Sequence, residues 1–142
     1  MNHIINNIWI GNSSDAKNLD QLKEANIDIV LNVAFDLNTP LIDRIVQCKV
    51  GLIDGPGNPF KAFICAVNLL DALCKVGSVL IHCHEGKSRS ASVLAAYITS
   101  KTGCSLDKAY QTIAEKRPII EPKAAMYELA SNYIQYHKEI ST

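Results

Sequence analysis

The fold is decided by the stretch Val79-Leu80-Ile81-His82-Cys83-His84-Glu85-Gly86-Lys87-Ser88-Arg89-Ser90-Ala91. Residues 78–81 form a short apolar run, which predicts a strand buried on both faces. Residues from Ser90 to about Lys101 are apolar at helical length and predict a helix. The polar residues 83–89 therefore form a loop that joins the carboxyl end of a buried strand to the N-terminus of a helix.

Strands and helices alternate along the rest of the chain. We expect strands at 7–10, 27–33 and 45–53, and helices from Ser13 or Ser14 to about 25, from Asn58 to about 75, from Ser105 to about 117, and from Pro122 onward. The alternation predicts an α/β domain with a central, largely parallel, twisted sheet flanked by helices. In such domains ligands bind at the carboxyl ends of strands, where the loops 54–58 and 83–89 lie.

Length and composition narrow the functional classes. We expect the 142 residues, of which 48% are hydrophobic, to form a single domain over 1–142. Fourteen basic residues balance fourteen acidic ones, so a broad nucleic-acid surface is not expected. The first seven residues lack the features of a signal peptide, and no apolar run approaches membrane-spanning length. We expect a cytoplasmic monomer (nuclear as well if the source is eukaryotic), without a stable membrane anchor.

The loop at 83–89 carries groups that suit an anion. A helix N-terminus presents unpaired amides and a partial positive charge, and consecutive loop amides can converge on one anion. Gly86 allows a backbone conformation that a Cβ would oppose, and Arg89 adds a planar fork of donors. The thiolate of cysteine is the nucleophilic form, and this positive surrounding, with a hydroxyl from Ser88 or Ser90, would stabilise it at Cys83.

Two other interpretations apply to the same residues. A cysteine at the end of a strand is more often a buried structural residue, and a glycine in a strand-to-helix loop is common. The run His82-Cys83-His84 also contains three residue types that bind metals. At strand periodicity, however, the two histidines point together and the cysteine points away, so we expect no metal site. The other four cysteines, at 48, 65, 74 and 104, form no CxxC pair, which argues against a zinc cluster or a disulfide framework.

The segment His82-Cys83-x-x-Gly86-x-x-Arg89-Ser90 resembles the HCxxGxxR[S/T] signature of the cysteine-dependent protein tyrosine phosphatases. The chain as a whole is similar to their small, atypical dual specificity branch. The similarity extends to the segments 8–11, 29–34, 90–97 and 117–122. The resemblance implies a hydrolase that needs no metal and no cofactor. It also implies action on phosphotyrosine and phosphoserine or phosphothreonine in proteins, because a chain this short lacks the loops that deepen the tyrosine-specific pocket.

The resemblance also implies a role for each residue of the loop. Cys83 would attack phosphorus and form a phosphocysteine, and Ser90 would donate a hydrogen bond to the thiolate. Arg89 and the loop amides would hold the phosphoryl oxygens. The substrate-binding residues would thus be His84, Glu85, Gly86, Lys87, Ser88 and Arg89. His82 would order the loop without touching the substrate.

The leaving group needs a proton from a residue outside this loop. Asp36, Asp43 and Asp54 each follow a predicted strand and precede Cys83. We expect Asp54 to be the acid, because it ends the preceding strand in a loop rich in glycine and proline, where the family also places its acid. Taken alone, an Asp-Gly pair is most often only a turn.

Several positions depart from the family pattern or leave alternatives open. Lys123 and Glu128 stand where many members carry Asn and Gln, and we expect these changes to affect packing or docking but not the chemistry. Lys87 is similar to a lysine of phosphoinositide phosphatases, so phosphoinositides or other non-protein phosphates remain alternative substrates. Cys48 resembles a cysteine that some relatives pair reversibly with the nucleophile, but a small core residue is the favoured interpretation of this position. A phospho-binding module without turnover and a sulfurtransferase are the alternatives from other classes, although the chain keeps both Cys83 and Arg89.

Overall fold

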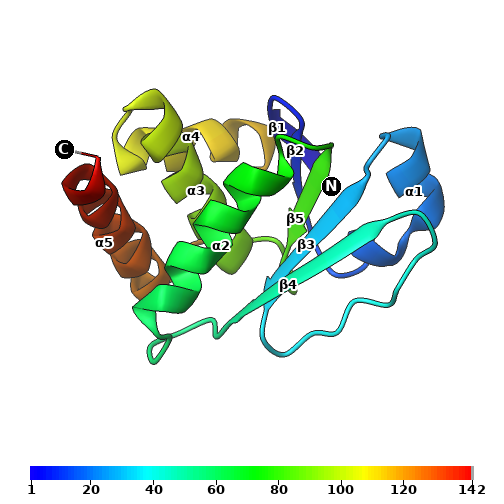
Figure 1. Cartoon of the computed structure of the whole chain (residues 1–142), viewed down its shortest axis with the longest axis horizontal. Helices are drawn as coiled ribbons and strands as arrows, with labels where there is room; N and C mark the ends of the chain where they lie inside the picture. The colour runs from blue at the N-terminus through cyan, green and yellow to red at the C-terminus, as the bar shows by residue number, and fades with distance from the viewer. Residues whose placement is uncertain (142) are drawn as a thin grey trace.

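The computed structural model describes residues 1–141 (Figure 1). They form a twisted sheet with long helices on one face and short helices on the other. The strands are β1 (Asn2–Ile5), β2 (Ile8–Gly11), β3 (Ile29–Ala34), β4 (Val46–Leu52) and β5 (Val79–His82). The helices are η1 (Asp15–Lys17), α1 (Leu19–Glu24), α2 (Phe60–Leu73), α3 (Arg89–Thr102), α4 (Leu106–Lys116) and α5 (Ala124–Ile140). The predicted α/β class with a largely parallel sheet is confirmed.

The sheet order is β1-β2-β5-β3-β4, and only the β1–β2 pair is antiparallel. In the parallel part Ile81 of β5 pairs with Ile10 of β2 on one side and with Leu31 of β3 on the other. The strand that leads into Cys83 therefore lies between two parallel neighbours. The carboxyl ends of β2, β3, β4 and β5 meet at one edge of the sheet, as parallel pairing requires.

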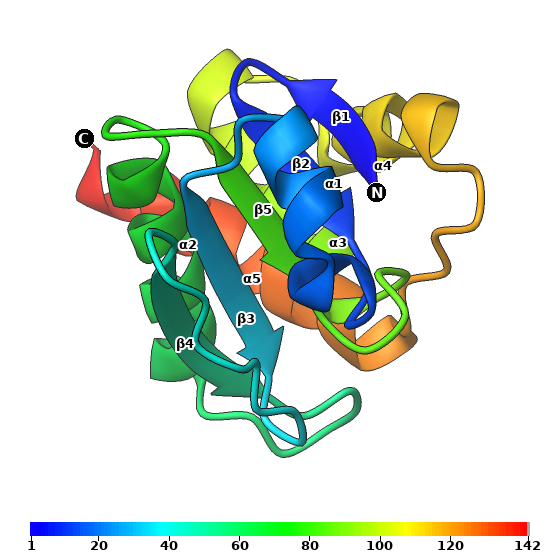
Figure 2. The same cartoon turned by 90° about the vertical axis from the view of Figure 1, so that its right-hand side faces the viewer.

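The two faces of the sheet bury two cores. Ile29, Leu31 and Val33 of β3 belong to the large core, which lies under α2, α3, α4 and α5. Val30 and, on β5, Leu80 point the other way into a small core with residues of η1 and α1. This alternation follows from the period of two along a strand. Figure 2 shows α1 in front of the sheet and α2, α3 and α5 behind it.

The structure corrects several details of the sequence interpretation. Strand β1 was not expected, and it pairs with β2 through a turn in which Asn6 has a φ of 50°. Helix α1 begins after Asn18, whose side chain accepts a hydrogen bond from the Gln21 amide, and not after Ser13 or Ser14. The expected cap at Ser105 is confirmed, because its hydroxyl accepts from the Lys108 amide at 3.1 Å. None of the helices within residues 1–141 is long and apolar enough to cross a bilayer.

Candidate active site

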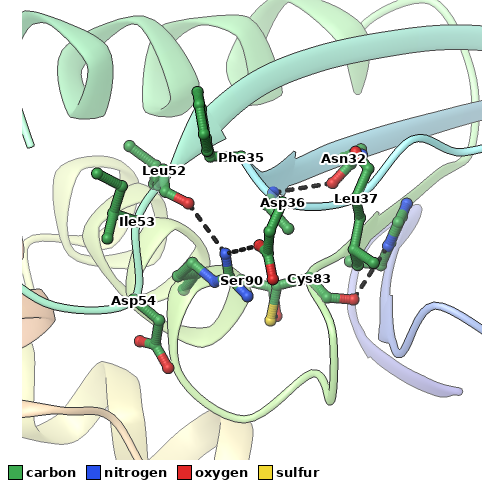
Figure 3. Close-up of polar contacts among 12 residues, drawn as sticks. Asn32, Phe35, Asp36, Leu37, Leu52, Ile53, Asp54, Cys83 and Ser90 are labelled. Carbon is green, nitrogen blue, oxygen red and sulfur yellow. Dashed lines mark hydrogen bonds and ion pairs between the residues drawn. The ribbon is translucent and has the colours of Figure 1, made fainter.

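The candidate site lies at the edge where the parallel strands end. Cys83 follows β5, and Asp36 follows β3. Leu52 is the last residue of β4, and Asp54 lies in the loop after it. Figure 3 shows these residues gathered around Cys83 together with Ser90, the second residue of α3. Cys83, Asp54 and Arg89 are among the residues that line one cavity of about 240 Å³. The cavity is also lined by His84, Glu85, Lys87, Ser88 and Lys123. The loop 83–89 predicted from the sequence thus meets Asp54 as expected.

The carbonyl groups of the loop point away from the cavity and are held from outside. The His84 carbonyl accepts from the Ser13 amide at 3.0 Å, and the Lys87 carbonyl accepts from the Glu121 amide at 2.8 Å. Between them, the carbonyls of Glu85 and Gly86 accept from the guanidinium of Arg117 at 3.1 and 2.9 Å. In a planar trans peptide the next N–H points opposite to the carbonyl, so the amides of residues 85–88 turn the other way. Consecutive amides on one side of a loop form an anion-binding concavity.

Gly86 is the one loop position where only glycine fits. Its φ is +69°, and an added Cβ would come within 2.4 Å of the Gly11 carbonyl oxygen and 2.7 Å of Arg117 Nη2. The loop therefore packs directly on the end of β2. This close approach is what holds the carbonyl of Gly86 toward Arg117 and its neighbours' amides toward the cavity.

Arg117 is a buried residue that the sequence interpretation did not single out. Its third contact is from Nη1 to Asn2 Oδ1 at 2.7 Å, so the unexpected strand β1 helps to fix it. Burial lowers the pKa of the guanidinium, but an arginine stays protonated in proteins. Arg117 thereby places a positive charge behind the loop. Its burial at the end of a helix could not be foreseen, because the partners are main-chain carbonyls that any sequence provides.

Arg89 is held at one end of its guanidinium and free at the other. Nη1 donates to Asp36 Oδ1 at 2.6 Å and to the Leu52 carbonyl at 3.0 Å. Figure 3 labels the two acceptor residues. Nε is buried and has no hydrogen-bond partner among the described residues. An edge of the planar fork is therefore left for an anion, and a guanidinium binds two phosphate oxygens best through such an edge.

Asp36 was considered as a general acid, but the structure places its carboxylate on Arg89. The hydrogen bond from Arg89 lowers the pKa of the Asp36 carboxyl below its usual value, so this residue is ionised at neutral pH. The buried amide of Asn32 fixes the turn that presents it: Oδ1 accepts from the Ala34 amide and Nδ2 donates to the Leu37 carbonyl, both at 2.8 Å. Asp36 therefore orients the arginine. The third candidate acid, Asp43, lines a different cavity beside α1.

The sulfur of Cys83 is buried and lies 3.2 Å from the Ser90 hydroxyl. From the residues alone Ser88 and Ser90 were alternatives for this contact, and the family resemblance assigned it to Ser90. Ser88 Oγ instead accepts from the Lys123 amide at 3.0 Å, so Ser90 is the hydroxyl at the sulfur. A hydroxyl donor beside a thiolate stabilises its negative charge.

His82 supports the loop from below. Its Nδ1 contacts the Cys83 carbonyl at 3.1 Å and its Nε2 contacts the Thr39 hydroxyl at 2.9 Å. A neutral ring with the proton on Nδ1 satisfies both contacts. Burial lowers the pKa of His82 below 6.5, which also favours the neutral ring. Within residues 1–141 no three His, Cys, Asp or Glu side chains are arranged to hold a metal ion.

Asp54 lies across the cavity, in the loop between β4 and α2. Its Oδ2 is 3.0 Å from Lys123 Nζ, and its Oδ1 is buried without a partner in the described part of the chain. Asn58 was expected to cap α2, but its amide instead closes the loop. Oδ1 accepts from the Ile53 amide at 2.8 Å, and Nδ2 donates to the carbonyls of Ile53 and Gly55 at 2.8 and 3.2 Å.

Known proteins are similar to this chain in both sequence and fold. The model of the family described as dual specificity phosphatase, catalytic domain, matches residues 8–135. The chain belongs to the dual specificity phosphatase family. The family assigns it cysteine-dependent protein phosphatase chemistry, and the resemblance read from the sequence is confirmed.

Curated relatives and solved structures show how far the similarity extends. Dual specificity phosphatase 28 of Mus musculus is 30% identical over 131 residues, which are 90% of this chain and 80% of that protein. Dual specificity protein phosphatase 1 of Arabidopsis thaliana is 33% identical over 82% of this chain, but the match spans only 60% of that relative. The crystal structure of human DUSP28 superimposes with a TM-score of 0.86 at 23% identity and covers 99% of both chains. That last likeness shows the fold.

Within this dual specificity phosphatase domain, the expectation for Lys123 changes and the one for Cys48 stays untested. Lys123 was expected to affect packing or docking only, but its side chain lines the cavity and contacts Asp54. Cys48 lies in β4 opposite Leu31 and lines a separate cavity of about 140 Å³. Its pairing with the nucleophile stays a prediction.

Proposed function

We infer that this domain hydrolyses phosphomonoesters of tyrosine, serine and threonine in proteins through a phosphocysteine on Cys83. The observation that carries the proposal is the arrangement around the sulfur. Cys83 Sγ has the Ser90 hydroxyl at 3.2 Å, and the inward amides of residues 85–88 and the unpartnered Nε of Arg89 surround the same cavity. Each of these groups favours negative charge, first on sulfur and then on the phosphoryl oxygens.

In the first step an electron pair of the Cys83 thiolate forms the S–P bond while the ester P–O bond breaks. The Asp54 carboxyl gives its proton to the departing oxygen, so the alcohol or phenol leaves neutral. The phosphoryl oxygens gain negative charge as the bonds exchange, and Arg89 with the loop amides is placed to stabilise it. Because the donors are fixed beforehand, little reorganisation is needed at the moment of reaction.

In the second step water attacks the phosphocysteine. The Asp54 carboxylate takes a proton from that water as the new P–O bond forms and the S–P bond breaks. The bonding pair returns to Cys83 sulfur as a thiolate, and the Ser90 hydroxyl donates a hydrogen bond to it. Inorganic phosphate then leaves, and Asp54 is again protonated for the next cycle.

The partner class that fits this mechanism is a phosphoprotein. We expect the domain to act as a monomer in the cytoplasm. We expect no binding to nucleic acid, because its basic and acidic residues balance. The basic side chains at the rim are already paired: Lys87 Nζ lies 3.4 Å from Glu85 and Lys123 Nζ 3.0 Å from Asp54. This pairing favours a singly phosphorylated site over a polyanionic substrate.

One peptide that carries both phosphothreonine and phosphotyrosine tests the proposal. Wild type and Cys83→Ser are assayed at pH 6 with chelator and reductant, and mass spectrometry reports which site loses phosphate. Loss from both sites by wild type alone is the expected result. Loss from phosphotyrosine alone would narrow the substrate class, whereas loss from neither, with turnover of a phosphoinositide or binding without turnover, would overturn the proposal.

A further inference from the structure

Lys123 is fixed to the phosphate-binding loop through its backbone. Its amide donates to Ser88 Oγ at 3.0 Å, and two residues earlier the Glu121 amide donates to the Lys87 carbonyl at 2.8 Å. Arg117, in the same connection between α4 and α5, holds the carbonyls of residues 85 and 86. The segment 117–123 thus contacts four consecutive residues of the loop, and Lys123 ends it.

The side chain of Lys123 reaches across the cavity to the opposite loop. Its Nζ contacts Asp54 twice, at 3.0 Å to Oδ2 and at 3.2 Å to the main-chain carbonyl. A single ammonium group can satisfy two acceptors, because it carries three donors. Both the backbone and the carboxyl group of Asp54 are therefore held from one point.

The other bonds of the Asp54 loop do not orient its carboxyl group. The three hydrogen bonds of the Asn58 amide reach only main-chain atoms of Ile53 and Gly55. With Oδ2 on Lys123, the oxygen that remains for proton exchange is Oδ1, which has no partner among residues 1–141. The contact with Lys123 thus holds one carboxyl oxygen and leaves the other without a partner.

We propose that Lys123 is a positioning residue that couples the phosphate-binding loop to Asp54 and aims the carboxyl group at the leaving-group oxygen. It acts through Asp54 and does not bind the phosphoryl group. This inference rests on the proposed function, since it requires Asp54 to protonate the leaving group. It gives a role to a lysine at a position where the sequence predicted only an effect on packing or docking.

The test separates proton transfer from phosphate binding by varying the leaving group. A p-nitrophenyl leaving group departs with little help from an acid, whereas a phenyl group needs its proton. The parameter is kcat/KM, because it covers the steps up to departure of the leaving group and excludes hydrolysis of the phosphocysteine. The variants are Lys123→Met, Lys123→Arg and the matched control Lys108→Met, an exposed lysine of α4.

For Lys123→Met we expect kcat/KM on phenyl phosphate to fall about tenfold, part of the roughly 10²–10⁴ that a positioned acid contributes. On p-nitrophenyl phosphate we expect less than about a twofold change, and inhibition by inorganic phosphate stays unchanged. Lys123→Arg restores much of the loss because it keeps the charge. In an Asp54→Asn background Lys123→Met has no further effect.

An equal loss on both esters together with weaker inhibition by phosphate would overturn the inference and make Lys123 a phosphate-binding residue. No change on either ester would overturn it as well. Failure of the Cys83 mechanism, on which the inference rests, has a different signature, because wild type and Cys83→Ser would then have the same activity on every ester. Melting temperatures of the three variants show whether any loss comes from unfolding.

Discussion

The two loops that flank the cavity are held in different ways. The loop that follows β5 is fixed through its own main chain: a buried arginine and two backbone amides hold four consecutive carbonyls. The loop that follows β4 is held by side chains, the amide of Asn58 and the ammonium of Lys123, and the side chain of Lys123 is 60% exposed. Main-chain bonds fix where several amides point at once, whereas side-chain bonds fix the direction of one carboxyl group.

This difference predicts two classes of variant. Changes in the loop 83–89 should reduce activity on every phosphate ester, because all substrates present the same phosphoryl group. Changes around Asp54 should reduce activity most on esters whose leaving group needs a proton to depart, and least on esters whose leaving group departs without one. The same set of esters therefore separates the two loops.

Gly86→Ala should have the largest effect. The added Cβ would lie 2.4 Å from the Gly11 carbonyl oxygen, and the φ of +69° is unfavourable for alanine. The loop must therefore move, and its amides would no longer point toward the cavity. We expect kcat/KM to fall roughly 10²–10³-fold on every ester, the loss typical for misplaced donors to a developing oxyanion. The control is Gly103→Ala, which has a φ of +76° but open space around the Cβ.

Chemical denaturation of the two glycine variants completes this comparison. Gly103→Ala bears only the backbone strain of a left-handed residue, about 1–2 kcal/mol of unfolding free energy. Gly86→Ala bears the same strain and the steric clash, so it should be less stable than Gly103→Ala. Equal stabilities and equal activities would show that the close contact between the loop and β2 is unimportant.

Asp54→Asn should have the next largest effect, but only on some substrates. An amide cannot donate a carboxyl proton, so we expect kcat/KM on phenyl phosphate to fall about 10²-fold. On p-nitrophenyl phosphate the loss should be several-fold smaller. If the two esters lose activity equally, Asp54 is not the acid, and the distinction between the two loops fails.

Asp36→Asn should have a smaller effect that belongs to the first class. The variant keeps an oxygen acceptor for Arg89 but removes the charge that holds Nη1 at 2.6 Å. The Asp36 side chain is 61% exposed, so the ion pair itself contributes at most about 1 kcal/mol to stability. We expect KM to rise about three- to tenfold on both esters, because the fork of Arg89 is less well oriented.

The control for this variant is Asp43→Asn, an exposed carboxylate that lines a different cavity. Tighter inhibition of Asp36→Asn by inorganic phosphate would contradict the prediction. It would show that Asp36 competes with the substrate for Arg89 instead of orienting it.

The sequence predicted the first loop far better than the second. The pattern Cys83-x-x-Gly86-x-x-Arg89-Ser90 spans one loop and the first two residues of the helix that follows, so local spacing was enough to bring these residues together. Asp54 could be named because a parallel sheet brings the ends of neighbouring strands to one edge. The two core strands β3 and β5 were predicted for a different reason, because their mostly apolar runs are typical of strands buried on both faces.

The contacts that the sequence did not reveal join residues far apart in the chain. Lys123 is 69 residues from Asp54, and Arg89 is 53 residues from Asp36. Arg117 binds carbonyl groups, which carry no sequence signal. Strand β1 was missed because Asn2 and His3 break the apolar pattern and only Ile4 of this strand is buried, so its place depends on pairing with β2. Such contacts follow from the assembled fold and not from local patterns.

The smallest predicted effect concerns the stability of the protein. It tests His82, which supports the loop 83–89 through the Cys83 carbonyl. Burial lowers the pKa of His82, so the unfolded chain binds a proton near pH 6.5 that the folded protein does not. The free energy of unfolding should therefore decrease as the pH falls below about 6.5, by at most about 1.4 kcal/mol for each pH unit and each proton.

The measurement is urea denaturation between pH 7.5 and 5.5 of wild type and His82→Asn. The variant should be less stable at pH 7.5, because the contact with Thr39 is weakened, yet its stability should depend less on pH. An unchanged pH dependence would contradict this prediction, because it would mean that His82 binds its proton equally well in the folded and the unfolded states.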